Sequence, residues 1–168
     1  MRKIYLDMDG VVADWRTAAE ALLKTRIDQY GERIPKDEWD KIKNASRFYR
    51  FLPLMPGAHE LVYYCQRREA DKQIEGVYFL TALPHDYSMP YTAQDKVWWA
   101  HQHFPNIPVF FGPFSHDKCR YCEPGDILID DRHSNCHDWR AVGGLAHEYK
   151  SWDACKLWLE QVLVDEAS

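Results

Sequence analysis

The stretch Lys3-Ile-Tyr-Leu-Asp7-Met-Asp9-Gly10 decides the fold, and it continues as Val11-Val12-Ala13-Asp14. A short apolar run delivers two aspartates, one residue apart, into a glycine turn. On a strand, Asp7 and Asp9 would point the same way, because side chains alternate with period 2. If the chain leaves the strand between them, a carboxylate and a backbone carbonyl converge on one hard cation. Two close carboxylates repel each other, so the motif indicates a cation and phosphate site.

Apolar runs alternate with helical patterns along the rest of the chain. We expect strands at about residues 3–7, 76–81, 109–111, 126–131 and 144–148. Helices are expected at about residues 15–30, from Pro35, and at about 58–68, 92–104 and 152–164. Strands that are apolar throughout and separated by helices indicate a parallel sheet covered on both faces. The predicted fold class is therefore α/β, a three-layer Rossmann-like parallel sheet.

Polar residues follow three of these apolar runs. Asp7 follows the first, Thr81 ends the second, and Asp130 and Asp131 end the fourth. In parallel sheets ligands bind at the carboxyl ends of the strands, so residues far apart in sequence become one candidate site. An isolated DxDG segment is more often a calcium-type loop or a solvated turn, and the later residues distinguish the alternatives.

Composition limits the class of protein. The chain has 168 residues, 46% of them hydrophobic, which predicts one domain over 1–168 with a small insert. A net charge of -5 argues against binding to duplex nucleic acid, which normally needs a basic face. No apolar run approaches the roughly 18 residues of a membrane span. Five cysteines without an export signal favour free thiols in the cytoplasm.

The set Asp7-x-Asp9, Thr81, Lys118 and Asp130-Asp131, in this order, resembles the haloacid dehalogenase (HAD) superfamily of phosphohydrolases. Further motifs are similar to the 5'(3')-deoxyribonucleotidase family. These are Asp7-Met-Asp-Gly-Val-Val-Ala-Asp14, Leu54-Met-Pro-Gly-Ala58, and Asp117-Lys118 followed by Asp126-Ile-Leu-Ile-Asp-Asp-Arg132. The resemblance covers nearly the whole chain and implies a HAD-like core with a small helical cap insert at about residues 15–55.

The resemblance implies a role for each motif residue. Asp7 would be the nucleophile that forms an aspartyl-phosphate, and Asp9 would be the general acid and base. The phosphate would be held by Thr81, Ala82 and Lys118. The cofactor would be Mg²⁺, with Asp7, the Asp9 carbonyl and Asp131 as ligands and Asp130 orienting the site, although the choice between the last two stays open.

Substrate contacts are implied for the cap insert and for one loop of the core. Trp15, Phe48 and Tyr49 offer aromatic faces on which a nucleobase can stack. The alternative for each ring is packing of the cap against the core. Ala82 stands where the family often has Ser, and His85 replaces a basic residue in the same loop. These differences leave the base, the sugar and the 5' or 3' position of the phosphate open.

The sequence thus predicts a cytoplasmic, magnesium-dependent phosphatase of nucleoside monophosphates, with no membrane partner. Alternatives are a HAD phosphatase for another small phosphomonoester or a nucleic-acid phosphate end, and a non-catalytic nucleotide-binding module. A response-regulator receiver domain fits less well, because its acidic pair follows the first strand. The oligomeric state stays open, with a homodimer as one alternative.

A second metal site is a rival interpretation of the cysteines. His116, Cys119, Cys122 and Cys136 offer zinc-like ligand types, although reduced thiols are the simpler expectation.

Overall fold

Five parallel strands form one sheet in the computed structural model, which describes residues 1–30, 34–84, 89–112 and 114–164. The order across the sheet is β3-β2-β1-β4-β5, and every neighbouring pair is parallel. The strands are β1 (Lys3–Leu6), β2 (Gly76–Thr81), β3 (Val109–Phe111), β4 (Ile127–Asp130) and β5 (Leu145–Glu148). All five predicted strands and the predicted fold class are confirmed, within a residue or two at the strand ends.

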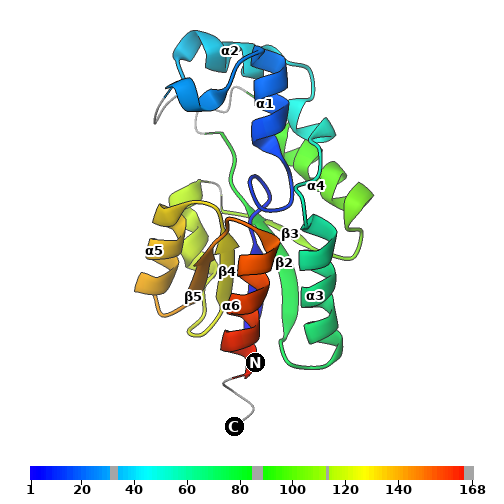
Figure 1. The fold of residues 1–168 in the computed structure, drawn as a ribbon, viewed down its shortest axis with the longest axis vertical. Helices are drawn as coiled ribbons and strands as arrows, with labels where there is room; N and C mark the ends of the chain where they lie inside the picture. The colour runs from blue at the N-terminus through cyan, green and yellow to red at the C-terminus, as the bar shows by residue number, and fades with distance from the viewer. Residues whose placement is uncertain (31–33, 85–88, 113, 165–168) are drawn as a thin grey trace.

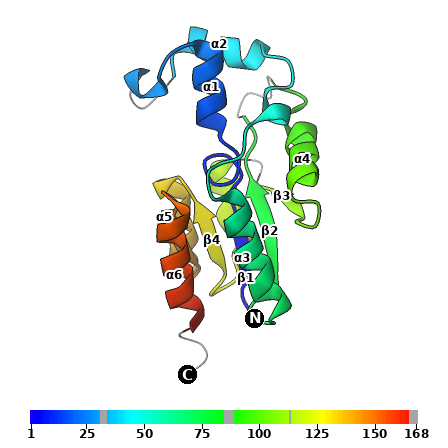
Figure 2. The same ribbon diagram turned by 45° about the vertical axis from the view of Figure 1, so that its right-hand side comes forward.

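Alternation along the central strand sends side chains to both faces of the sheet. Ile4 and Leu6 lie in one apolar cluster with residues of α3 (Ala58–Ala70), α4 (Thr92–His103) and α6 (Trp152–Val164). Tyr5 lies in a second cluster with residues of α5 (His133–Ala141) and η3 (Ser115–Tyr121), a 3-10 helix. Helices therefore cover both faces of the sheet, as Figures 1 and 2 show.

The first helix is shorter than predicted. We expected it to reach residue 30, but α1 spans Trp15–Leu23 because Lys24 takes a left-handed conformation with φ 54°. The Lys24 N–H donates to the Glu20 carbonyl there and closes the helix. A short 3-10 turn, η1 (Ile27–Tyr30), follows.

Helix α5 was missing from the prediction. Its sequence, HSNCHDWRA, lacks an apolar stripe, and its buried residues are Asn135, Cys136 and Trp139. Trp139 alone supplies a large apolar side chain to the sheet. Its indole N–H donates to the Asp126 carbonyl at 3.0 Å. Tertiary packing, rather than periodicity, defines this helix.

The segment between Asp14 and Pro53 stands beyond the carboxyl edge of the sheet, at the top of Figure 2. It contains α1, η1, α2 (Lys36–Asn44) and the 3-10 helix η2 (Phe48–Phe51). Its own small apolar cluster centres on Ala19, Leu23 and Ile42. We call this segment the cap segment.

The two chain connections to the cap segment run side by side. The Asp14 N–H donates to the Pro53 carbonyl at 2.7 Å, and the Met55 N–H donates to the Val12 carbonyl at 2.8 Å. These two hydrogen bonds fix the base of the cap segment directly beside the loop that carries Asp9.

Helix α4 holds the other side of the cap segment. Asp95, which is buried, forms an ion pair with Arg47 at 2.8 Å. Arg47 also lies over the ring of Tyr91, 4.5 Å from its centroid. The Trp99 indole N–H donates to the Leu52 carbonyl at 2.7 Å. One helix of the core therefore contacts η2 through charge, a ring and a buried hydrogen bond.

Candidate active site

Three adjacent strands bring the predicted site residues together. Asp7 follows β1, Thr81 ends β2 and Asp130 ends β4, and β1 lies between the other two in the sheet. Because these strands are parallel, their carboxyl ends meet at one edge, as the sequence analysis expected. All three residues are buried.

Lys118 enters this edge from η3 rather than from a strand. Its ammonium lies 2.8 Å from Asp7 Oδ1 and 2.7 Å from Asp130 Oδ2. The lysine side chain is only 2% exposed, so it compensates both carboxylates in a medium that screens charge poorly. The sequence analysis predicted that Lys118 binds the phosphate. In the structure its ammonium lies between the carboxylates of Asp7 and Asp130.

Asp130 is held by the protein on every side. Its carboxylate accepts from the side-chain amide of Asn135 at 2.9 and 3.0 Å, from the Arg132 N–H at 2.9 Å, and from Lys118. A carboxylate with this many fixed donors is suited to orienting Lys118 and its neighbours. Asn135 was missed by sequence reasoning, because it lies on the unpredicted helix α5.

Asp131 is the more open member of the late acidic pair. Oxygen atoms of Asp7, Asp130 and Asp131 lie within 4.8 Å of one another, and this is the one such His/Cys/Asp/Glu group found among the described residues. Hard carboxylate oxygens are the ligands that suit Mg²⁺. The Asp9 side chain is not part of the group, and a metal contact through its backbone carbonyl stays a prediction.

Gly10 makes room for this group. Its φ is +82°, and a Cβ at this position would lie 2.2 Å from Asp131 Oδ2. The glycine of the DxDG motif is therefore required twice, for its backbone conformation and for the approach of Asp131.

The carboxylate of Asp7 is strongly perturbed. Burial raises its pKa from 3.8 to about 8, against the opposing effect of Lys118, and Asp130 and Asp131 raise it further. Without a bound cation, Asp7, the predicted nucleophile, therefore favours its protonated form at neutral pH. A divalent cation next to these oxygens would reverse that preference.

Asp9 belongs to a separate polar cluster. Lys96 of α4 donates to Asp9 Oδ2 at 2.6 Å and to Thr81 Oγ1 at 2.7 Å. Sequence reasoning missed Lys96, because a lysine within an amphipathic helix carries no local sign that it points into the protein. The buried atom Asp9 Oδ1 has no hydrogen-bond partner within the described part of the chain.

The predicted aromatic residues lie in the cap segment at different depths. Trp15 packs edge-to-face against Phe48, with ring centroids 6.0 Å apart. Tyr49 is buried, and Lys96 lies 4.9 Å from its ring centroid. A cavity of about 280 Å³ between the cap segment and the start of α4 is lined by Phe48, Tyr49 and Tyr91 among others.

Two further residues predicted to lie in the site, Ala82 and His85, follow β2 in the sequence. Ala82 is half-buried directly after Thr81. His85 lies outside the described residues. The structure therefore brings most of the predicted site residues together at the carboxyl edge of the sheet. That the loop after β2 binds a phosphate stays a prediction.

The rival zinc site is not assembled. Within residues 1–30, 34–84, 89–112 and 114–164, no metal-binding group includes Cys119, Cys122 or Cys136. The Cys119 thiol donates instead to the His116 carbonyl at 3.4 Å, and Cys136 is buried on α5. The five cysteines, all within the described residues, form no disulfide in the structure, and their reduced, metal-free state stays a prediction.

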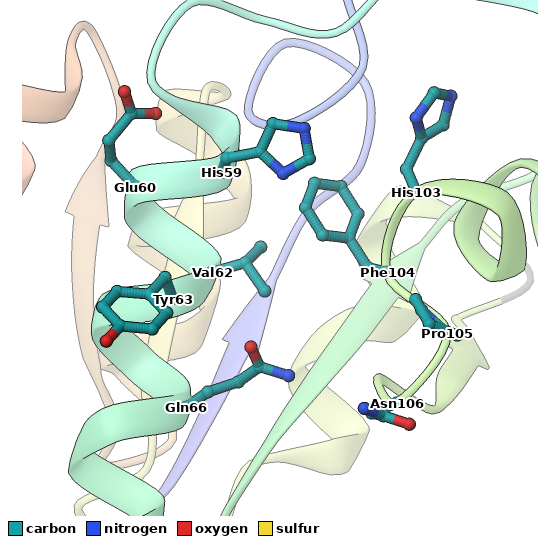
Figure 3. Close-up of a pocket in the computed structure, with 9 residues that line it drawn as sticks. All are labelled: His59, Glu60, Val62, Tyr63, Gln66, His103, Phe104, Pro105 and Asn106. Carbon is teal, nitrogen blue, oxygen red and sulfur yellow. The ribbon is translucent and has the colours of Figure 1, made fainter.

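The structure has a larger cleft, of about 540 Å³, whose lining contains none of the four aspartates of the candidate site. It is formed by α3 and by the end of α4 with the turn that follows, and its lining includes His59 and Phe104, whose neighbouring rings have centroids 5.2 Å apart (Figure 3). None of the predicted site residues lines it. Size therefore does not identify the reactive centre in this protein.

This fold and this cluster of acidic residues agree with the HAD-like core that the sequence analysis expected. Among solved structures, a hydrolase from Streptococcus pneumoniae TIGR4 aligns with a TM-score of 0.54 and 14% identity, covering 95% of this chain and 98% of that chain. A hydrolase from Pseudomonas syringae aligns with a TM-score of 0.50 and 14% identity, covering 87% and 82%. These two likenesses show a shared fold. A comparison with curated proteins returned no match.

A family model described as 5' nucleotidase, deoxy (pyrimidine), cytosolic type C protein (NT5C) matches residues 1–151. The chain belongs to this family, and it is a phosphoric monoester hydrolase of the nucleotidase type. The family resemblance drawn from the motifs is thereby confirmed. Among the described residues, no helix is long and apolar enough to cross a membrane.

Gly10→Ala should displace Asp131 and weaken divalent-cation binding by at least tenfold in a fluorescence titration with Mg²⁺. Gly125→Ala is the matched control, since Gly125 has φ +91° but a Cβ added there would meet no atom within 4 Å. Both variants should lose roughly 1–3 kcal/mol of stability from backbone strain. Equal cation affinity in the two variants would contradict the role given to Gly10.

Asp7→Asn should stabilise the metal-free fold. A carboxyl group whose pKa rises on folding keeps its proton while the unfolded chain loses it, so the cost to stability grows between pH 4 and about 8 and then levels off. The gain in melting temperature of Asp7→Asn over wild type, measured in EDTA, should therefore increase from pH 5 to pH 8. The exposed Asp71 offers a control, since Asp71→Asn should show no such trend.

Proposed function

We propose that this protein is a cytoplasmic, magnesium-dependent nucleotidase that hydrolyses deoxyribonucleoside monophosphates through an aspartyl-phosphate on Asp7. One observation carries the proposal. The structure supplies two aspartates, Asp7 and Asp9, in different polar surroundings, each with its own buried lysine. Two carboxylates in separate environments can take separate roles, one as nucleophile and one as acid and base.

Asp7 is proposed to attack phosphorus and to release the nucleoside oxygen. When bound by Asp7, Asp131 and the neighbouring oxygens, Mg²⁺ supplies positive charge that offsets the repulsion between carboxylate and phosphate. Lys118 holds Asp7 Oδ1, so the second oxygen of Asp7 is the one available for attack. Asp130 keeps that lysine in place through its own contact at 2.7 Å.

Asp9 is proposed to act on the leaving oxygen and on the attacking water, whereas Asp7 acts on phosphorus. It donates a proton to the leaving oxygen and then accepts one from the water that cleaves the aspartyl-phosphate. Thr81 accepts a hydrogen bond from Lys96 at 2.7 Å, which leaves its own hydroxyl hydrogen to donate to a phosphate oxygen. Ala82 and Lys118 are proposed to complete the phosphate contacts.

The substrate assignment rests on the family and on the cap segment. The family description names deoxy and pyrimidine nucleotidases of cytosolic type. Phe48 and Tyr49 line the 280 Å³ cavity beside the site, and Trp15 supports Phe48 from within the cap segment. A net charge of -5 supports a small substrate rather than duplex nucleic acid. Free cysteines are in keeping with a cytoplasmic location.

The test is phosphate release from a panel of nucleoside monophosphates that includes dUMP and dTMP, with Mg²⁺ and with EDTA. Wild type should require Mg²⁺, and Asp7→Asn should lose at least 1,000-fold in kcat, an order-of-magnitude expectation for removal of a nucleophile. Asp71→Asn should match wild type. Near-wild-type turnover by Asp7→Asn would exclude the covalent mechanism, and turnover of other phosphomonoesters alone would exclude the nucleotide assignment.

Phe48→Ala should weaken nucleotide substrates selectively. Loss of one stacking contact corresponds to about 1–3 kcal/mol, or roughly 5- to 150-fold in kcat/KM for dUMP. The same variant should change kcat/KM for 4-nitrophenyl phosphate by less than about threefold, since its ring needs no defined stack. Phe51→Ala, at a 70% exposed residue of the same 3-10 helix, serves as the control. Equal losses on both substrates would refute the stacking role.

A further inference from the structure

We propose that Lys96 is a positioning residue that directs the transferable proton of the general acid to one atom, Asp9 Oδ1. The inference deepens the proposed function and rests on the role of Asp9 as acid and base. It assigns a mechanistic part to a residue of α4 that no sequence motif of the site includes.

The position of Lys96 is tightly defined. Its side chain is 2% exposed, and its ammonium lies 2.6 Å from Asp9 Oδ2. The same nitrogen lies 2.7 Å from Thr81 Oγ1 and 4.9 Å from the ring centroid of Tyr49. A carboxylate, a hydroxyl and an aromatic ring thus lie close to the ammonium.

A buried ammonium without such partners would destabilise the fold, because its desolvation costs several kcal/mol. The nearby Lys118 already compensates Asp7 and Asp130. Lys96 is therefore not needed to neutralise Asp7 or Asp130. Within the described part of the chain, the ion pair that Lys96 forms is with Asp9.

The two oxygens of Asp9 are thereby made different. Lys96 donates to Oδ2, so a proton on this carboxyl group belongs on Oδ1, where no ammonium hydrogen competes. Oδ1 is buried and has no hydrogen-bond partner among the residues that the structure describes. An unpartnered buried oxygen is costly unless a ligand completes it, so its natural partner is the leaving oxygen or the attacking water.

The proton transfers balance in both half-reactions. In the first, the phosphorus–oxygen bond to the nucleoside breaks, its electron pair stays on the leaving oxygen, and the proton on Oδ1 moves to that oxygen. The carboxylate left on Asp9 is then stabilised by Lys96. In the second, Oδ1 takes a proton from water as the water oxygen bonds to phosphorus and the Asp7–phosphorus bond breaks.

Helix α4 keeps Lys96 in place through its neighbours. Asp95 pairs with Arg47 of the cap segment, and Trp99 donates to the Leu52 carbonyl. These contacts lie before and after Lys96 on the same helix. They restrict rotation of α4 and hold the ammonium within reach of Asp9.

Leaving groups that differ in their need for a proton test the proposal. 4-Nitrophenolate leaves without protonation, whereas the nucleoside of dUMP needs an acid. The experiment measures single turnovers with Lys96→Met in excess over substrate and Mg²⁺ present, so that release of alcohol or phenol reports the first half-reaction alone. We expect nucleoside release from dUMP to slow roughly 10- to 100-fold, as general acid catalysis predicts. Release of 4-nitrophenolate should slow less than about threefold.

Equal slowing of both substrates would overturn the proposal, because a purely structural lysine would disturb the two reactions alike. Gln102→Ala, at an exposed residue of α4, should leave both rates unchanged. If Lys96→Met does not fold, Lys96→Ala, which likewise lacks a donor at this position, decides by the same ratio of rates. If wild type releases 4-nitrophenolate but not the nucleoside of dUMP, the nucleotide assignment fails separately, and the ratio is then measured with glycerol 3-phosphate as the alkyl ester.

Discussion

The structure depends on how it compensates four carboxylates gathered at the carboxyl edge of one sheet. Asp7, Asp9, Asp130 and Asp131 come from β1, β4 and the residues that follow them, and parallel strands force them together. Neither β1 nor β4 supplies the compensating charge, since Lys118 comes from η3 and Lys96 from α4. The helices that cover the sheet therefore supply charged side chains to the site as well as apolar side chains to the core.

The two lysines divide three of the four carboxylates, Asp7, Asp9 and Asp130, into two groups. Lys118 joins Asp7 and Asp130, whereas Lys96 joins Asp9 to Thr81. Compensation at Asp7 is incomplete, because burial still raises its pKa to about 8. A buried site whose negative charge is incompletely neutralised favours the binding of a cation. The same site lowers the stability of the fold, which is a common trade-off between stability and activity.

Helix α4 links the chemistry to the cap segment. Consecutive residues on this helix point to different partners, Asp95 to Arg47 and Lys96 to Asp9. The connections at residues 12–14 and 53–55 hold the other side of the cap segment through paired backbone hydrogen bonds. Tyr49 of η2 is thereby held beside the pair of Asp9 and Lys96, with its ring centroid 4.9 Å from the Lys96 ammonium.

The sequence by itself determined the parallel sheet, the acidic residues at its carboxyl edge and the family. Apolar runs and period-2 alternation are local properties, and parallel strands place their ends together without further information. Only the tertiary structure decided the positions and contacts of Lys96 and Asn135, the existence of α5 and the early end of α1. A polar side chain on a helix turns inward only when the packing of that helix gives it a buried partner, and local sequence does not record that partner.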